Sequence, residues 1–121
     1  MVRRLALAAL AALACWQPAL GQDRQPAGRQ ALVDLAFVLG QSHALRQACQ
    51  GEADQYWRSR MLRLIDVEAP DEALKARLVQ SFTTGFNGAR TGFPDCNTAT
   101  RQEASKSALR GRSLSDSLAS P

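Results

Sequence analysis

The stretch ALVDLAFVLGQSHALRQAC, residues 31–49, carries apolar side chains at the spacing of one helical face. They recur at intervals of three and four residues, which is the period of an α-helix. Further apolar residues widen this face, so we predict a helix from Ala31 to Cys49 that lies at the centre of the fold. The face comprises Leu32, Leu35, Ala36 and Leu39, widened by Val33, Phe37, Val38 and Leu45.

Three more helices are predicted downstream, over residues 53–68, over 71–92 and from 97 onward. Gly51 stands just past the first helix, where a left-handed cap is favoured, and Asn97 is a preferred N-cap residue. Gly111 is expected to interrupt the fourth helix, whose apolar content is thin. The predicted stripes are Trp57, Met61, Leu64 and Ile65 in the second helix and Leu74, Leu78, Phe82, Phe86, Ala89 and Phe93 in the third.

No segment alternates with the period of a β-strand, and the connections between the predicted helices are short. Short connections favour antiparallel neighbours, so the sequence predicts an all-α fold, a small up-down bundle of three to four helices. We expect one domain over residues 31–112, preceded by a flexible leader over 22–30 and followed by a frayed, serine-rich tail over 113–121.

Residues 1–21 have the layout of a secretory signal peptide. Arg3 and Arg4 precede an apolar run that is twelve residues long, and Ala19 and Gly21 supply the small side chains that signal peptidase requires. We therefore expect cleavage after Gly21 and a periplasmic or secreted protein. The run is shorter than the roughly 20 residues of a spanning helix, so no membrane span is expected after cleavage.

A second cleavage pattern places a lipidated cysteine at Cys15. Leu13 stands one residue too close to that cysteine for a good lipoprotein signal, and Trp16 is a poor second residue. The sequence therefore favours cleavage after Gly21 over a lipoprotein.

The charge of the chain argues against nucleic-acid binding. Fifteen Lys and Arg face eleven Asp and Glu, giving a formal charge of +4, and removal of the signal peptide leaves thirteen bases. This surplus is small and scattered along the sequence, whereas nucleic-acid binders concentrate it.

Cys49 and Cys96 are the two cysteines that remain after cleavage. In an oxidising compartment an even pair predicts one disulfide, and in an up-down bundle the end of the first helix and the start of the fourth lie together. The alternative is two free thiols with a redox role. Because no Cys-x-x-Cys motif is present, we favour the structural disulfide.

Several motifs together resemble a family of small exported alphaproteobacterial proteins of unknown function that have two well-separated cysteines. The resemblance covers about residues 31–115 and implies export, a disulfide and a helical domain, but no reaction. Its motifs are LGQSHALRQAC at 39–49, WRSRM at 57–61, DVE at 66–68, Phe82 with Gly85 and Phe86, and Cys96.

His43 is the only histidine and falls on the apolar stripe of the first predicted helix. One interpretation is a buried imidazole paired with a carboxylate or carbonyl, beside a Gly40 that allows close helix contact. The other is a ligand pocket or a general base, in an envelope enzyme that uses His43 with Glu68 or Arg46 on a cell-wall substrate. The first is favoured, with Glu68 expected to pair with Arg58, Arg77 or His43.

Ser42 and His43 do not make a catalytic dyad, because neighbours on a helix point about 100° apart. With one histidine and both cysteines committed, we expect no metal site and no cofactor. Gly85, Gly88 and Gly92 share one helical side, which is typical of a groove for a neighbouring helix.

Arginine and aromatic side chains gather at the start of the second predicted helix, and such residues dominate binding hot spots. The alternative is a core tryptophan with arginines spread over its edge. We expect a non-catalytic binding or envelope accessory module whose partner is an envelope protein or cell-wall component. The candidate binding residues are His43, Arg46, Tyr56, Trp57, Arg58 and Arg60.

Overall fold

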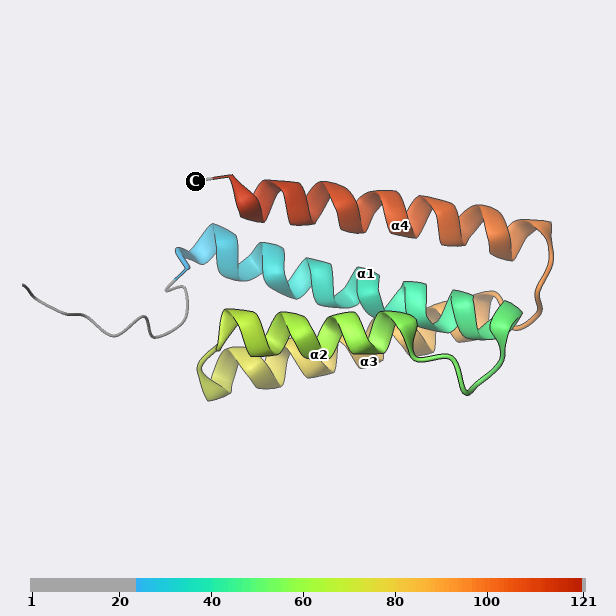
Figure 1. Ribbon diagram of the computed structural model, residues 1–121, viewed down its shortest axis with the longest axis horizontal. Helices are drawn as coiled ribbons and strands as arrows, with labels where there is room; N and C mark the ends of the chain where they lie inside the picture. Colours follow the sequence, from blue (N-terminus) through green and yellow to red (C-terminus); the bar gives the residue numbers. More distant parts are fainter. Residues whose placement is uncertain (1–23, 121) are drawn as a thin grey trace, which may run out of the picture.

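The computed structural model describes residues 24–120, which fold into four helices without a strand in that range. Successive helices run in opposite directions, so that the start of α4 lies beside the end of α1 (Figure 1). The predicted all-α, up-down arrangement is therefore confirmed. The expected signal peptide and Cys15 lie outside the described residues. The helices are α1 (Pro26–Gln50), α2 (Tyr56–Glu68), α3 (Glu72–Gly92) and α4 (Thr98–Ala119).

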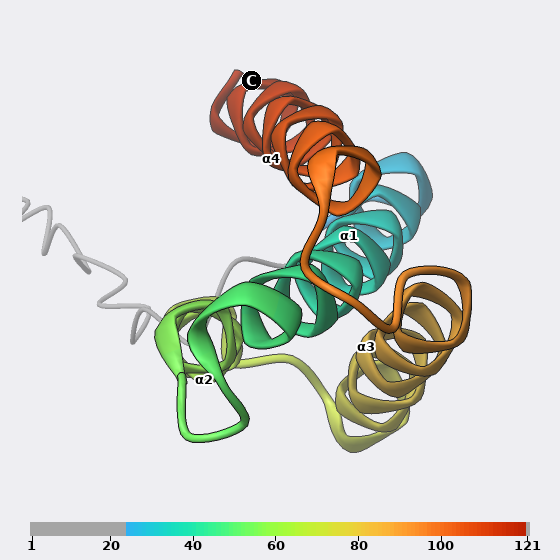
Figure 2. The same ribbon diagram turned by 90° about the vertical axis from the view of Figure 1, so that its right-hand side faces the viewer.

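Helix α1 lies at the centre, and each of the other three helices packs against it (Figure 2). Ten residues of α1 are buried, compared with two each in α2 and α4. The long apolar face of α1 explains this arrangement, because it is wide enough to contact three neighbours while each neighbour contributes a narrow stripe. The predicted central position of the first helix is confirmed.

The apolar core is divided into two clusters along α1. The larger one joins α1 to α2 and α3 and contains Leu32 and Leu78, both fully buried. The smaller one lies nearer the disulfide, where Leu45 and Ala89 pack with Phe86 and Phe93. Both clusters are built on the predicted stripes of the first and third helices.

The closest helix contact is between α1 and α3 and depends on two glycines. A Cβ at Gly40 would overlap the carbonyl of Phe82, and a Cβ at Gly85 would overlap the carbonyl of Phe37. The expected role of Gly40 is confirmed. Of the three glycines expected to form a groove, only Gly85 does so, since Gly88 and Gly92 face open space.

Three predicted helix ends require correction. Helix α1 begins at Pro26, so residues 26–30 are helical and not a flexible leader; proline suits the first turn, where its missing N–H is not needed. Helix α4 continues through Gly111 to Ala119, because Leu114 and Leu118 pack against the core beyond that glycine. The expected fraying from residue 113 is therefore not observed.

Helix α2 begins at Tyr56, three residues later than expected. The connection before it is held by the Gln47 amide, which donates to the backbone carbonyls of Glu52 and Asp54 at 2.8 and 3.2 Å. Gly51 ends α1 at the predicted place, but with a φ of 99° and a ψ of 161° it does not adopt the left-handed cap that was expected; that conformation is found at Ala69, which ends α2.

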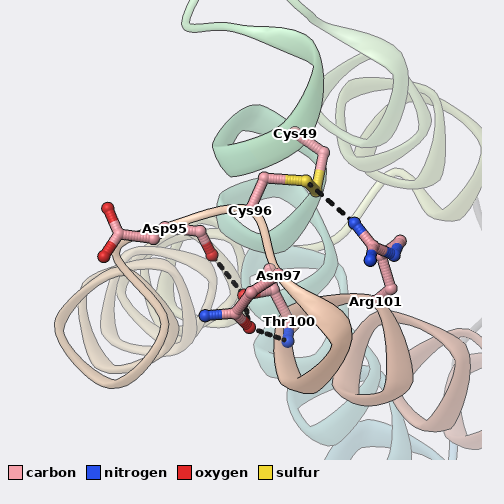
Figure 3. The surroundings of a disulfide bond; sticks show 6 residues. All are labelled: Cys49, Asp95, Cys96, Asn97, Thr100 and Arg101. Atoms are coloured by element: carbon pink, nitrogen blue, oxygen red, sulfur yellow. Dashed lines mark hydrogen bonds between the residues drawn. A yellow bond between two sulfur atoms is a disulfide. The ribbon is translucent and has the colours of Figure 1, made fainter.

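The predicted disulfide joins Cys49 at the end of α1 to Cys96 before α4, across 47 residues of sequence (Figure 3). Asn97 caps α4 as expected, accepting a hydrogen bond from the Thr100 amide at 3.0 Å. The guanidinium of Arg101 lies 3.7 Å from the Cys96 sulfur. The disulfide and the cap together fix the position at which α4 starts against α1.

Candidate functional site

A groove runs between α2 and α4, with α1 as its floor. Both helices pack on α1, but they form no comparable interface with each other. Three cavities of about 540, 330 and 590 Å³ follow one another along this space. We call it the α2–α4 groove. Its principal lining residues are Leu35, Leu39, Ser42 and Leu45 of α1, Trp57, Arg60 and Leu64 of α2, and Arg101, Ala108, Arg112 and Ser115 of α4.

Four of the six predicted binding residues form one cluster at the mouth of this groove. The guanidinium groups of Arg46 and Arg60 lie 4.6 and 4.4 Å from the centre of the Tyr56 ring. Tyr56 meets Trp57 edge to face, with ring centres 5.0 Å apart. Arg60 also donates to the Tyr56 hydroxyl at 2.6 Å. We call these residues the arginine–aromatic cluster, an arrangement in which each cation lies on an aromatic face.

Asp54 orients the cluster from outside the groove. Its carboxylate accepts from Arg46 Nε at 2.9 and 3.0 Å and from the Tyr56 backbone amide at 3.2 Å. Arg60 has no carboxylate partner within the described part of the chain. The charge of Arg46 is therefore neutralised by Asp54, whereas the charge of Arg60 is not compensated by a nearby carboxylate.

Two predicted binding residues lie apart from the cluster. Arg58 is exposed and lines none of the three cavities. His43 is buried, because its position on α1 faces α3, where its ring lies 5.7 and 5.3 Å from those of Phe82 and Phe86. Of the six predicted binding residues, the structure therefore groups only four: Arg46, Tyr56, Trp57 and Arg60.

The His43 imidazole has no partner for Nδ1 among the described residues, which corrects the expected pairing with a carboxylate or carbonyl. Burial lowers the pKa of His43, the positive charge of Arg58 lowers it further, and the negative charge of Asp54 acts in the opposite direction. Burial therefore favours the neutral form of the ring, which packs within the α1–α3 interface.

Glu68 is bound by Arg24, and not by any of its expected partners. The carboxylate accepts from Arg24 Nε and Nη2, both at 2.8 Å, and this hydrogen bonding raises the pKa of Arg24. The pair lies beside the start of α1, whereas His43 is seventeen residues into that helix, roughly 25 Å along its axis at 1.5 Å per residue. The structure therefore does not bring Glu68 to His43, which removes one of the two pairings expected for an enzyme. In the other, Arg46 lies three residues after His43 on α1, where its guanidinium is bound by Asp54.

Sequence reasoning missed the wall that α4 contributes. Arg101, Ala108 and Arg112 recur at seven and four residues, which places them on one side of that helix. Both arginines are exposed and, within residues 24–120, have no carboxylate partner. This spacing could have predicted a basic side of α4, but the sequence alone does not show that this side faces α2 across a groove.

The charges that line the groove are nearly all positive. Arg46, Arg60, Arg101 and Arg112 line its central and disulfide-proximal cavities, and no carboxylate lines either one. Glu68 lines the cavity at the other end, where Arg24 neutralises it. The groove thus combines an apolar floor with cationic walls, which suits an anionic ligand that has an apolar side.

Across residues 24–120, no three His, Cys, Asp or Glu side chains are arranged to hold a metal ion. None of the four helices has both the length and the apolar content needed to cross a bilayer. The class of protein defined by these features is a small disulfide-bonded helical domain with a basic interhelical groove.

The family model described as "Protein of unknown function (DUF2385)" matches residues 28–121. The chain belongs to this family, whose model covers all four helices except the first two residues of α1. Comparisons with curated proteins and with solved structures found no match. The resemblance to a family of unknown function is therefore confirmed, and any function has to be argued from the groove itself.

Proposed function

We propose that this protein is a non-catalytic binding module of the bacterial cell envelope, and that it recognises its partner through the arginine–aromatic cluster and the α2–α4 groove. The observation that carries the proposal is the position of Arg60 and Trp57. Both line the groove, beside an exposed Tyr56, where a partner can contact them. Arginine and large aromatic residues contribute most of the binding energy in protein interfaces.

Two features support a location outside the cytoplasm. Residues 1–21 have the charge, apolar run and small residues of a signal peptide. The Cys49–Cys96 disulfide is of the kind that persists in oxidising compartments, and its Cys96 end is exposed to solvent. A small exported domain with this composition fits an accessory role in the envelope.

The test uses the full-length gene, expressed in its native host, and two matched double variants of α2. Trp57→Ala/Arg60→Ala truncates two α2 side chains that line the groove. Leu62→Ala/Arg63→Ala removes one apolar and one cationic residue from positions that line none of the three cavities. Partners are captured by crosslinking in intact cells and quantified by mass spectrometry, and folding is checked by circular dichroism.

We expect the Trp57/Arg60 variant to lose a specific envelope partner while the Leu62/Arg63 variant retains it. If the Trp57/Arg60 variant stays folded and keeps every partner, the recognition surface is wrong. If Trp57→Ala prevents folding, Arg60→Ala alone makes the same comparison, because Arg60 is exposed.

A further inference from the structure

We infer that the α2–α4 groove holds one α-helix of a partner protein, with an apolar stripe flanked on both sides by acidic residues. This inference rests on the proposed binding function and names the chemistry of the partner. It is carried by the shape of the groove, by the side chains of its floor and by the arginines on its two walls.

The groove has the length of a helix. It follows α4 from Arg101 to Ala119, which is about 27 Å at 1.5 Å per residue. A helix of five turns has the same length. The three cavities along it lie between two helices that both pack on α1 but form no substantial interface with each other, so a further helix has a place between them.

The floor and the α4 wall suit the apolar face of such a helix. Leu35, Leu39 and Leu64 supply apolar contacts along the groove. Ala104 and Ala108 have small side chains on the α4 wall, so the backbone of a bound helix can approach α4 closely there. Amphipathic helices bind grooves of this type through apolar anchors at helical spacing.

The walls carry positive charge on both sides. Arg60 lies on α2, while Arg101 and Arg112 lie on α4, eleven residues apart, or about 16 Å along the helix. None of the three has a carboxylate partner among residues 24–120. A helix in the groove would therefore have a cation on each flank, and complementary charges there would be acidic.

The charge pattern also argues against residues 1–21 of this chain as the occupant of the groove. Residues 1–21 contain an apolar run, but their only charged side chains are Arg3 and Arg4. A helix formed by this segment would bring two more positive charges to a basic groove. An acidic helix from another protein is the occupant that the wall charges favour.

The experiment is a selection from displayed 18-residue peptides that share a leucine stripe at helical spacing, with the flanking positions varied among Glu, Gln and Lys. The full chain is the target. Selected peptides are then titrated against two triple variants with equal loss of charge. Arg60→Gln/Arg101→Gln/Arg112→Gln alters the groove, and Arg63→Gln/Lys75→Gln/Arg77→Gln alters exposed cations that line none of the three cavities.

We expect Glu to be enriched on both flanks, at least tenfold weaker binding to the groove variant, and less than twofold change for the control. Affinity should also fall with added salt. The inference is overturned if no peptide is selected, if Gln or Lys is preferred at the flanks, or if both triple variants weaken binding equally. Should the cellular partner still depend on Trp57 and Arg60 in that case, the proposed function stands and only the acidic helix is rejected.

Discussion

The backbone carbonyl of Phe82 in α3 occupies the place that a Cβ would take at Gly40 in α1. Gly40→Ala should therefore force the two helices apart and reduce the free energy of unfolding by roughly 1–3 kcal/mol, the usual cost of overpacking. Urea denaturation followed by circular dichroism measures this change.

Gly88→Ala is the matched control for Gly40→Ala. Gly88 lies within α3, where an added Cβ meets open space, so alanine should leave stability unchanged or raise it by up to about 1 kcal/mol. Equal stability of the two variants would show that the backbones of α1 and α3 leave room for a Cβ at Gly40.

Removal of the disulfide should weaken the fold substantially. The bond closes a loop with a sequence separation of 47, for which chain entropy alone gives about 4 kcal/mol. We expect Cys49→Ala/Cys96→Ala to lose up to this amount, and reduction of the native protein by dithiothreitol to lose a similar amount. A loss below about 1 kcal/mol in both experiments would mean that helix packing alone positions α4.

His43 should make the fold sensitive to mild acid. Its pKa is lowered by burial, so below about pH 6.5 the unfolded chain binds a proton that the folded protein does not. Stability is therefore complete above pH 6.5 and falls as the pH decreases toward the lowered pKa, by at most about 1.4 kcal/mol per pH unit. Unfolding measured between pH 7 and pH 4.5 gives this slope.

His43→Leu should remove this part of the pH dependence. Asp71 acts at lower pH, because the hydrogen bond from the Leu74 amide, with that from Arg29, lowers its pKa below 3.8. Its contribution is lost only as the pH falls through that lower range. An unchanged slope between pH 6.5 and pH 4.5 in His43→Leu would contradict the assignment.

The Arg24–Glu68 pair should hold the residues before α1 against α2 and α4. Arg24 also donates to the carbonyl of Leu118 at 3.1 Å. Arg24→Met leaves the buried Glu68 carboxylate without its partner and should cost about 3 kcal/mol, the lower end of the usual range for a broken buried pair, while Arg24→Met/Glu68→Leu should recover most of the loss. Thermal unfolding of both variants is the measurement; no recovery in the double variant would indicate a role beyond charge pairing.

The sequence predicted those parts of the fold that depend on the spacing of apolar residues and on the pairing of two cysteines. The leucines of α1 and the three-to-four spacing in α3 define their buried faces without reference to any neighbour. Pro26 and Gly111 have low helix propensity, so the predicted helices were too short at these positions. In the structure Pro26 stands in the first turn of α1, where proline is tolerated. Core contacts of Leu114 and Leu118 keep α4 helical beyond Gly111.

The groove was only partly predictable. Tyr56, Trp57 and Arg60 are close in sequence, so their cluster was visible in the pattern. Arg112 joins them only because α2 and α4 pack on the same side of α1, a tertiary relationship that no local signal carries. The partner of Glu68 was missed for the same reason, since Arg24 reaches it across the bundle.

The most direct test of the binding groove is an ¹H–¹⁵N correlation spectrum of the full chain, titrated with the acidic peptide that the selection yields. We predict shifts at the Trp57 indole N–H and at the amides of Leu64, Ala108 and Arg112, with little change at Val79 on α3. Shifts centred on Val79, or none at the four groove positions at saturating peptide, would contradict the account.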